Sequence, residues 1–196
     1  MRGSLAVLVA ASFCVGLVSS PARAAEVAAE VSNARTAMRH FGEACLKRLG
    51  NPAGIKAWAE QNKLPPVSHP RMRAIMIGEG EGSAWGLPSQ TEQRLGLSLK
   101  VPSDRCAVWA EAANAAELKN LFELVIKGLA SPSLDIKKMQ DVASPSTSGE
   151  GRTITYLMAI KGAHAGFQIS LITSTGSLYA DAPLQASLQV IPARTN

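Results

Sequence analysis

Histidine and cysteine, the side chains that most often carry chemistry, are scarce in this chain, which has three of each. His40, Glu43 and Cys45 lie close together on a predicted helix, where their side chains could approach a common zinc ion. A zinc site needs more ligands than this segment offers, and Cys45 is the expected partner of Cys106. We therefore interpret His40 and Glu43 as part of a solvated helix face, and the sequence predicts no metal site and no cofactor.

The other two histidines lie in predicted loops. His69 stands between Ser68 and Pro70, and His164 lies between glycines at a predicted hairpin tip, where exposed polar residues are common. The motifs G-x-S-x-G, S-x-x-K, H-E-x-x-H and C-x-x-C do not occur in the sequence. We predict no catalytic residue. The enzyme alternative is a hydrolase of cell-wall or envelope material that uses His69 or His164.

The stretch from Gly78 to Gly86 alternates glycine with Glu79 and Glu81 and then reaches Trp85. A phosphate-binding loop would need a lysine or bare amides, and the two carboxylates would repel phosphate. Two carboxylates could contact calcium, but the Asp-rich spacing of an EF-hand is absent. We interpret the stretch as a loop at a strand end with Trp85 packed on the core. The alternative is a lip that contacts a ligand or a partner.

Residues 1–24 have the pattern of a secretory signal peptide. A positive start at Met1-Arg2 is followed by the apolar run Leu5–Val18, and Pro21-Ala22-Arg23-Ala24 supplies an A-x-A cleavage site. The apolar run is too short for a convincing membrane span. Cys14 within it would be acylated in a lipoprotein, an alternative that the continuing apolar run disfavours. We predict a periplasmic mature chain, residues 25–196, that forms a single domain with no transmembrane segment.

The charge of the mature chain is moderate. The whole chain carries a formal charge of +5, and the predicted signal peptide removes two arginines and no acid, so that +5 − 2 leaves +3. A charge of this size with mixed signs is ordinary for a soluble domain and forms no basic stripe of the kind that binds nucleic acid. The sequence therefore predicts no nucleic-acid partner.

Once the signal peptide is removed, Cys45 and Cys106 are the only cysteines. Two cysteines in an oxidising compartment usually pair, and a redox-active pair would more often be a close C-x-x-C. A bond that closes a loop of about 60 residues would stabilise the fold by roughly 4 kcal/mol in the chain-entropy model. We predict a structural disulfide between them.

The amino-terminal half of the mature chain predicts two helices, a loop and a strand. Apolar residues recur at spacings of three and four along one helix face, at Val27, Val31, Ala34, Met38, Phe41, Cys45 and Leu49. Asn51 and Pro52 are typical of the start of a second helix that ends near Asn62. We expect a loop over Lys63–Pro70 and a strand over Arg71–Ile77.

The middle of the chain predicts strands. A short one is expected over Ala84–Leu87, and Arg94–Val101 alternates apolar with polar residues and pairs with Cys106–Glu111 across a turn. Cys106 and Val108 then face the core. Trp109 faces the other side of the sheet, where either a helix covers it or the indole is exposed as a contact residue.

The remainder predicts one helix and a hairpin. Asn114 and Glu117 resemble a capping box that opens a helix to about Ala130. Asp141–Gly151, rich in Ser, Pro and Gly, is expected to be the most mobile internal loop. Thr153–Lys161 and Phe167–Ser174 predict the last hairpin, with Tyr156 facing the core. The fold class is therefore α+β, with amino-terminal helices packed on a largely antiparallel sheet and one further helix between strand hairpins.

Three short patterns support a resemblance: Phe41-x-x-x-Cys45 on the first helix, Gly82-x-x-Trp85, and Cys106-x-Val108 ahead of a helix. They resemble a group of uncharacterised exported proteins of Proteobacteria, over roughly residues 41–122. The resemblance implies a periplasmic location in a Gram-negative cell and supports the disulfide. It implies no activity and no catalytic residue.

Taken together, the sequence predicts a non-catalytic binding or accessory protein of the cell envelope, whose partner is an envelope protein or a small ligand. The candidate contact residues are Glu79, Glu81, Trp85, Trp109 and His164. An inhibitor of a lytic enzyme is a further alternative. A net positive charge disfavours it because such enzymes are basic, although the acidic loop at Glu79 and Glu81 could compensate.

Overall fold

The strands of the described chain form one antiparallel sheet in the order β1-β2-β3-β7-β6-β5-β4. The computed structural model describes residues 21–89, 91, 94–144, 146–180 and 182–194, so that most of the predicted signal peptide lies outside it. The strands are β1 (Glu81–Leu87), β2 (Leu95–Val101), β3 (Arg105–Ala110), β4 (Leu134–Ser144), β5 (Gly151–Ile160), β6 (Ala165–Ser174) and β7 (Ala186–Arg194).

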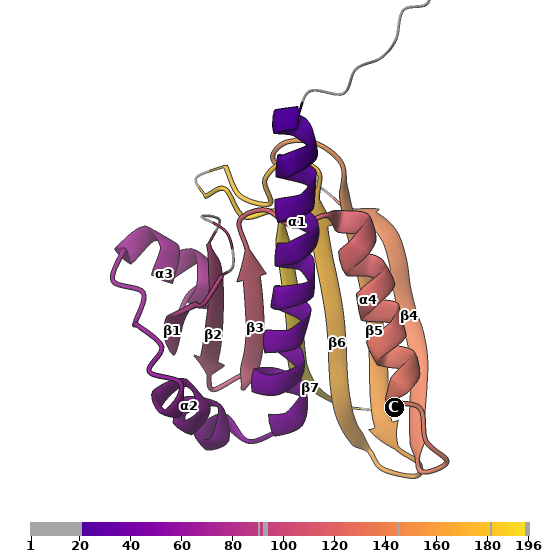
Figure 1. Cartoon of the computed structure of the whole chain (residues 1–196). Coiled ribbons are helices and arrows are strands. Elements are labelled where there is room, and N and C mark those ends of the chain that lie inside the picture. Colours follow the sequence, from indigo (N-terminus) through magenta and orange to yellow (C-terminus); the bar gives the residue numbers. More distant parts are fainter. Residues whose placement is uncertain (1–20, 90, 92–93, 145, 181, 195–196) are drawn as a thin grey trace, which may run out of the picture.

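The helices are α1 (Pro21–His40), α2 (Pro52–Gln61), α3 (Pro70–Ile77) and α4 (Ala115–Gly128). Beyond His40, α1 continues as a π-helical turn, η1 (Phe41–Cys45), and a 3-10 turn, η2 (Leu46–Arg48). Figure 1 shows α1 and α4 lying next to each other across one face of the sheet, with α3 beside β1. The predicted α+β class, with a helix between two groups of strands, is confirmed.

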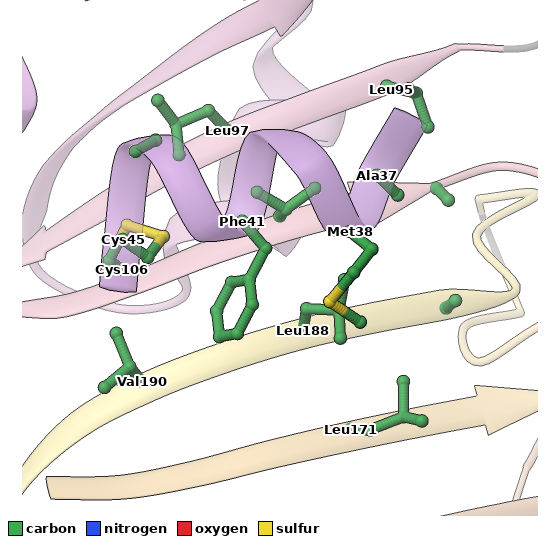
Figure 2. Close-up of a cluster of buried hydrophobic side chains, with 14 of the residues drawn as sticks. Ala37, Met38, Phe41, Cys45, Leu95, Leu97, Cys106, Leu171, Leu188 and Val190 are labelled. Atoms are coloured by element: carbon green, nitrogen blue, oxygen red, sulfur yellow. A yellow bond between two sulfur atoms is a disulfide. The ribbon is translucent and has the colours of Figure 1, made fainter. Parts of the chain in front are cut away.

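The main core lies between the sheet and the layer formed by α1, η1 and α4. Figure 2 shows Phe41 and Met38 pointing from the helix toward Leu188 of β7, with Leu97 of β2 on the same side. The predicted bond between Cys45 and Cys106 is present, with 5.6 Å between the two Cα atoms. The disulfide therefore fastens the end of the first helix to β3, near the middle of the sheet.

A smaller second core covers the opposite face of β1, β2 and β3. Met76 and Ile77 of α3 pack there against Trp109, together with Leu184 from the segment that precedes β7. The guanidinium of Arg105 donates to the carbonyl oxygens of Met76 and Ile77, at 3.0 and 3.1 Å. These bonds hold the last turn of α3 against the sheet, since the final carbonyls of a helix have no partner within it.

The strand predicted over Arg71–Ile77 is wrong, because these residues form α3. The alternation of Arg71 and Arg73 with apolar neighbours imitates a strand. Two features favour the start of a helix here. Pro70 occupies the first turn, where its missing amide is not needed, and Nδ1 of His69 accepts a hydrogen bond from the amide of Met72 at 3.4 Å.

The predictions for the carboxyl-terminal part need correction at two places. Asp141–Ser144 belong to β4 and pair with β5, so the expected mobile loop is shorter than predicted. The hairpin of β5 and β6 is not the last element, because β7 follows and lies between β3 and β6. The first strand of the middle region, β1, is confirmed and is longer than predicted.

At both ends of the first helix, the residues that are buried differ from those predicted. Val27, expected on the core face, is 47% exposed, whereas His40, expected in solvent, is only 7% exposed. The part of α1 that packs in the main core begins further along the helix, at Ala34. The predicted helix over Ala115 and beyond is confirmed, with the side chain of Asn114 accepting from the amide of Glu117 at 2.9 Å.

Candidate functional site

A cleft of about 420 Å³ opens where α3 and the segment of residues 65–69 lean over the ends of β1, β2 and β3. Its apolar walls are thioether, proline and aliphatic groups, and its polar groups lie at the rim. The residues that form it are Pro65, Pro66, Val67, Ser68, His69, Met72, Met76, Gly86, Leu87, Ser89, Thr91, Arg94, Leu95, Gly96, Trp109, Glu111 and Leu184.

The floor of the cleft is a row of three residues across neighbouring strands. Gly86 of β1 lies opposite Gly96 of β2, and Gly96 lies opposite Trp109 of β3, so that all three face the same side of the sheet. A Cβ atom at Gly96 would come within 2.5 Å of Cε of Met76. The glycines therefore allow Met76 and Pro65 to approach the backbone of the two strands closely, and the cleft opens beside these side chains and the indole edge.

Trp109 is buried, with 1% of its surface exposed, and its Nε1 donates to Oγ of Ser98 at 2.8 Å. Its ring lies 6.1 Å from that of Tyr179. Of the two alternatives for Trp109, cover by a helix is the one observed. The covering groups are α3 and the segment around Leu184, and the cleft reaches the indole between them.

The rim carries groups of both charges. Nε of Arg94 lies 3.6 Å from Oε1 of Glu111, and the backbone amide of Arg94 donates to the same carboxylate at 3.1 Å. Ser89 and Thr91, on the adjoining loop, donate to the side-chain oxygen of Asn33 in α1 at 3.0 and 2.9 Å. The rim is thus tied to the helical layer and can offer both a cation and a carboxylate to a ligand.

His40 supports the same loop from inside the protein. Its Nε2 lies 3.3 Å from the carbonyl oxygen of Pro88, and its Nδ1 has no hydrogen-bond partner among the described residues. Burial lowers the pKa of His40, and the charge of Arg39 adds to this, while the contact with Pro88 and the charge of Glu43 oppose it. The imidazole therefore favours its neutral form beneath the loop.

The described contacts do not assemble a histidine-based hydrolytic site. Within the described chain, no imidazole hydrogen-bonds to a serine hydroxyl or to a carboxylate. His69 caps α3 through Nδ1, and His164 is exposed at the tip between β5 and β6. No group of three or more His, Cys, Asp or Glu side chains in the part of the chain described here is placed to hold a metal ion.

The candidate contact residues predicted from the sequence do not form one site. Glu79 and Glu81 are exposed at the far end of β1, away from the cleft. Trp85 packs against the main core on the opposite face of β1, in agreement with the interpretation that placed it there. Of the predicted contact residues, Trp109 alone lines the cleft, together with His69 of the enzyme alternative and Gly86, the last residue of the glycine-rich stretch. Sequence reasoning missed Gly96 and the two methionines of α3.

No protein-family model matches this chain, and no curated protein shows significant similarity to it. Among the described residues, no helix is both long and apolar enough to cross a membrane.

Proposed function

We propose that the protein is a non-catalytic binding or accessory protein of the bacterial periplasm, and that the cleft beside Trp109 holds an apolar group of its ligand. The observation that carries this proposal is the row Gly86–Gly96–Trp109. Glycine inside a strand weakens the strand, and it often marks a place where a ligand or another backbone approaches closely. Here the two adjacent glycines let Met76 and Pro65 lie close to the strands, and with the indole ring they give the cleft an apolar floor.

The walls define the chemistry of the ligand. Met72 and Met76 contribute flexible, polarisable thioethers that adapt to ligands of different shape. Arg94 is largely exposed at the rim and lies 3.6 Å from the less exposed carboxylate of Glu111, and such a loose pair is weak enough to exchange for a polar group of a ligand. We infer that the ligand has an apolar group and a polar end.

The test uses N-phenyl-1-naphthylamine, an apolar dye that becomes fluorescent when it leaves water. Met72→Arg places a charge in the cleft wall, and we expect it to weaken dye binding at least tenfold. Leu124→Arg is the matched control, because Leu124 is an exposed apolar residue on α4, outside the cleft. Equal dye binding by both variants, each folded by circular dichroism, would exclude the cleft as the binding site.

The location is proposed on separate grounds. The amino-terminal pattern of residues 1–24, the disulfide and the resemblance to exported proteins of Proteobacteria support export. Osmotic shock of cells that express the full chain should release the protein, and amino-terminal sequencing should then begin at Ala25. A cytoplasmic protein that still begins at Met1 would contradict the proposed location without affecting the cleft.

A further inference from the structure

The N-terminus of α4 opens onto a second cavity, of about 860 Å³, on the face of the sheet opposite to the cleft. Its floor includes Ile154 and Leu171, which belong to the main core under α1 and α4. Its walls come from the first turns of α4, from the ends of β4 and β5, and from Thr173 of β6.

The first turn of α4 presents unbonded amides to this cavity. The side chain and the carbonyl of Asn114 accept from the amides of Glu117 and Leu118, both at 2.9 Å. The amides of Ala115 and Ala116 make no hydrogen bond with any residue that the structure describes. Both residues line the cavity, and their methyl groups are small, so a ligand can approach the positive end of the helix dipole.

Thr173 is an independent sign of a ligand. Only 6% of its surface is exposed, and it lines the same cavity. Within the described residues its hydroxyl has no hydrogen-bond partner, although the neighbouring Ser174 donates to the carbonyl of Ser148. The hydroxyl oxygen of Ser144, which lines the same cavity, is buried and has no hydrogen-bond partner among the described residues. Buried hydroxyls are normally hydrogen-bonded, because burial without a partner costs free energy.

Two cations adjoin these donors. Lys119 and Arg152 line the cavity, and each forms an ion pair with a carboxylate outside it. Nζ of Lys119 lies 2.8 Å from Oε2 of Glu123, and Nη2 of Arg152 lies 2.7 Å from Oδ1 of Asp141. These ion pairs are partly exposed and therefore weak, and both cations carry further donors. Glu150 is the one acidic residue in the lining.

Glu117, close by on α4, has its charge balanced by Arg35 at 2.9 Å. The lining of the cavity thus combines free amides, hydroxyls, and two cations with one carboxylate, while the acidic partners of the two cations lie outside it.

We propose that this cavity binds a phosphate group. A tetrahedral phosphate has enough oxygens to accept hydrogen bonds from two helix amides, a hydroxyl, an ammonium and a guanidinium together. A carboxylate has only two oxygens and cannot accept from all of them. The group could belong to a soluble phosphorylated solute or to the headgroup of an anionic phospholipid, and the chemistry of recognition is the same for both.

The test is an NMR titration of the folded, disulfide-bonded protein with inorganic phosphate, observed through backbone amides. We expect saturable shifts of the Ala115 and Ala116 amides. Thr173→Val removes only the unpartnered hydroxyl, and it should weaken binding about tenfold without loss of stability. Lys119→Gln should also weaken binding. Lys127→Gln, at the far end of α4 and outside the cavity, is the matched control and should bind as the unmodified protein does.

Flotation with vesicles distinguishes the two sources of the phosphate. Binding to phosphatidylglycerol vesicles but not to phosphatidylcholine vesicles, lost in Lys119→Gln, would assign a lipid headgroup. Binding of inorganic phosphate without vesicle binding would assign a soluble solute. The proposal is overturned if neither phosphate nor anionic vesicles bind, or if Lys119→Gln and Lys127→Gln have the same effect. Dye binding in the cleft is independent of each of these results.

Discussion

The indole nitrogen of Trp109 and the hydroxyl of Ser98 form a hydrogen bond between neighbouring strands, beneath α3. Both residues are almost completely buried, and Ser98 is completely so. The bond satisfies the single donor of the indole, which allows the largest side chain of the second core to lie against a sheet rather than at the surface. Ser98 is thus a structural partner of the cleft floor.

Replacement of Trp109 by Phe should destabilise the protein, because it leaves the Ser98 hydroxyl buried without a partner. The unsatisfied group costs about 1–3 kcal/mol, in addition to the lost apolar area. Urea unfolding of the unmodified protein, Trp109→Phe, Ser98→Ala and the double variant measures this coupling. We expect the double variant to lose less than the sum of the single losses, and strict additivity would show that the bond contributes nothing.

Removal of the disulfide should lower the free energy of unfolding by about 4 kcal/mol, because Cys45 and Cys106 are 61 positions apart in the sequence and the bond closes a long loop. The measurement is guanidinium unfolding of the double variant Cys45→Ala, Cys106→Ala. The unmodified protein in reducing agent serves as a second route to the same state. A loss below about 1 kcal/mol by both routes would mean that the main core holds α1 on the sheet without the bond.

Gly82→Ala should destabilise the edge of the sheet. A Cβ atom there would lie 2.5 Å from the backbone oxygen of Leu99 and 2.8 Å from Cγ2 of Ile77, and a backbone oxygen cannot move aside as a side chain can. We expect a loss of about 1–3 kcal/mol in thermal or urea unfolding, as for other overpacked positions.

Gly42→Ala is the control, because a Cβ atom at that position meets nothing within 4 Å. There alanine should be neutral or stabilising, by up to about 1 kcal/mol. Loss of stability in Gly42→Ala but not in Gly82→Ala would contradict the packing at β1.

Acidification should destabilise the fold through His40. Its pKa in the folded state is lowered from the ordinary value of 6.5, chiefly by burial. As the pH falls below about 6.5, the unfolded chain takes up a proton that the folded imidazole does not. The free energy of unfolding should therefore fall between that pH and the lowered pKa of the folded state.

The measurement is urea unfolding at a series of pH values. His40→Gln should show a smaller fall, because the glutamine amide does not titrate in this range. His164→Gln, which replaces an exposed histidine, is the control variant. A fall of the same size in all three proteins would assign the pH dependence to other groups.

Local patterns were enough to predict several elements. The alternation in β2 places Leu97 and Gly96 on opposite faces of the sheet, as expected, and Cys45 and Cys106 meet because both face inward. These predictions hold because a period of two or of three to four residues reports directly which side of an element is buried. The capping position of Asn114 was readable for the same local reason.

Other features depend on residues far apart in the sequence. β7 contains Pro192, which argues against a central strand. Its pairing with β3 ends at Val190, so the proline lies where only β6 is a neighbour. His40 was predicted to face solvent because its burial comes from the loop at Pro88, 48 residues away. The cleft, likewise, needs the register that brings Gly86 opposite Gly96.

The position of β7 has a consequence for the order of assembly. It is the last of the described strands in the chain, yet it lies between β3 and β6 and joins the two halves of the sheet. A ribosome-bound chain that ends before residue 186 can form its hairpins but cannot bring β1–β3 together with β4–β6. Such nonlocal closure makes folding slow. The sheet can therefore become continuous only after β7 has been synthesised.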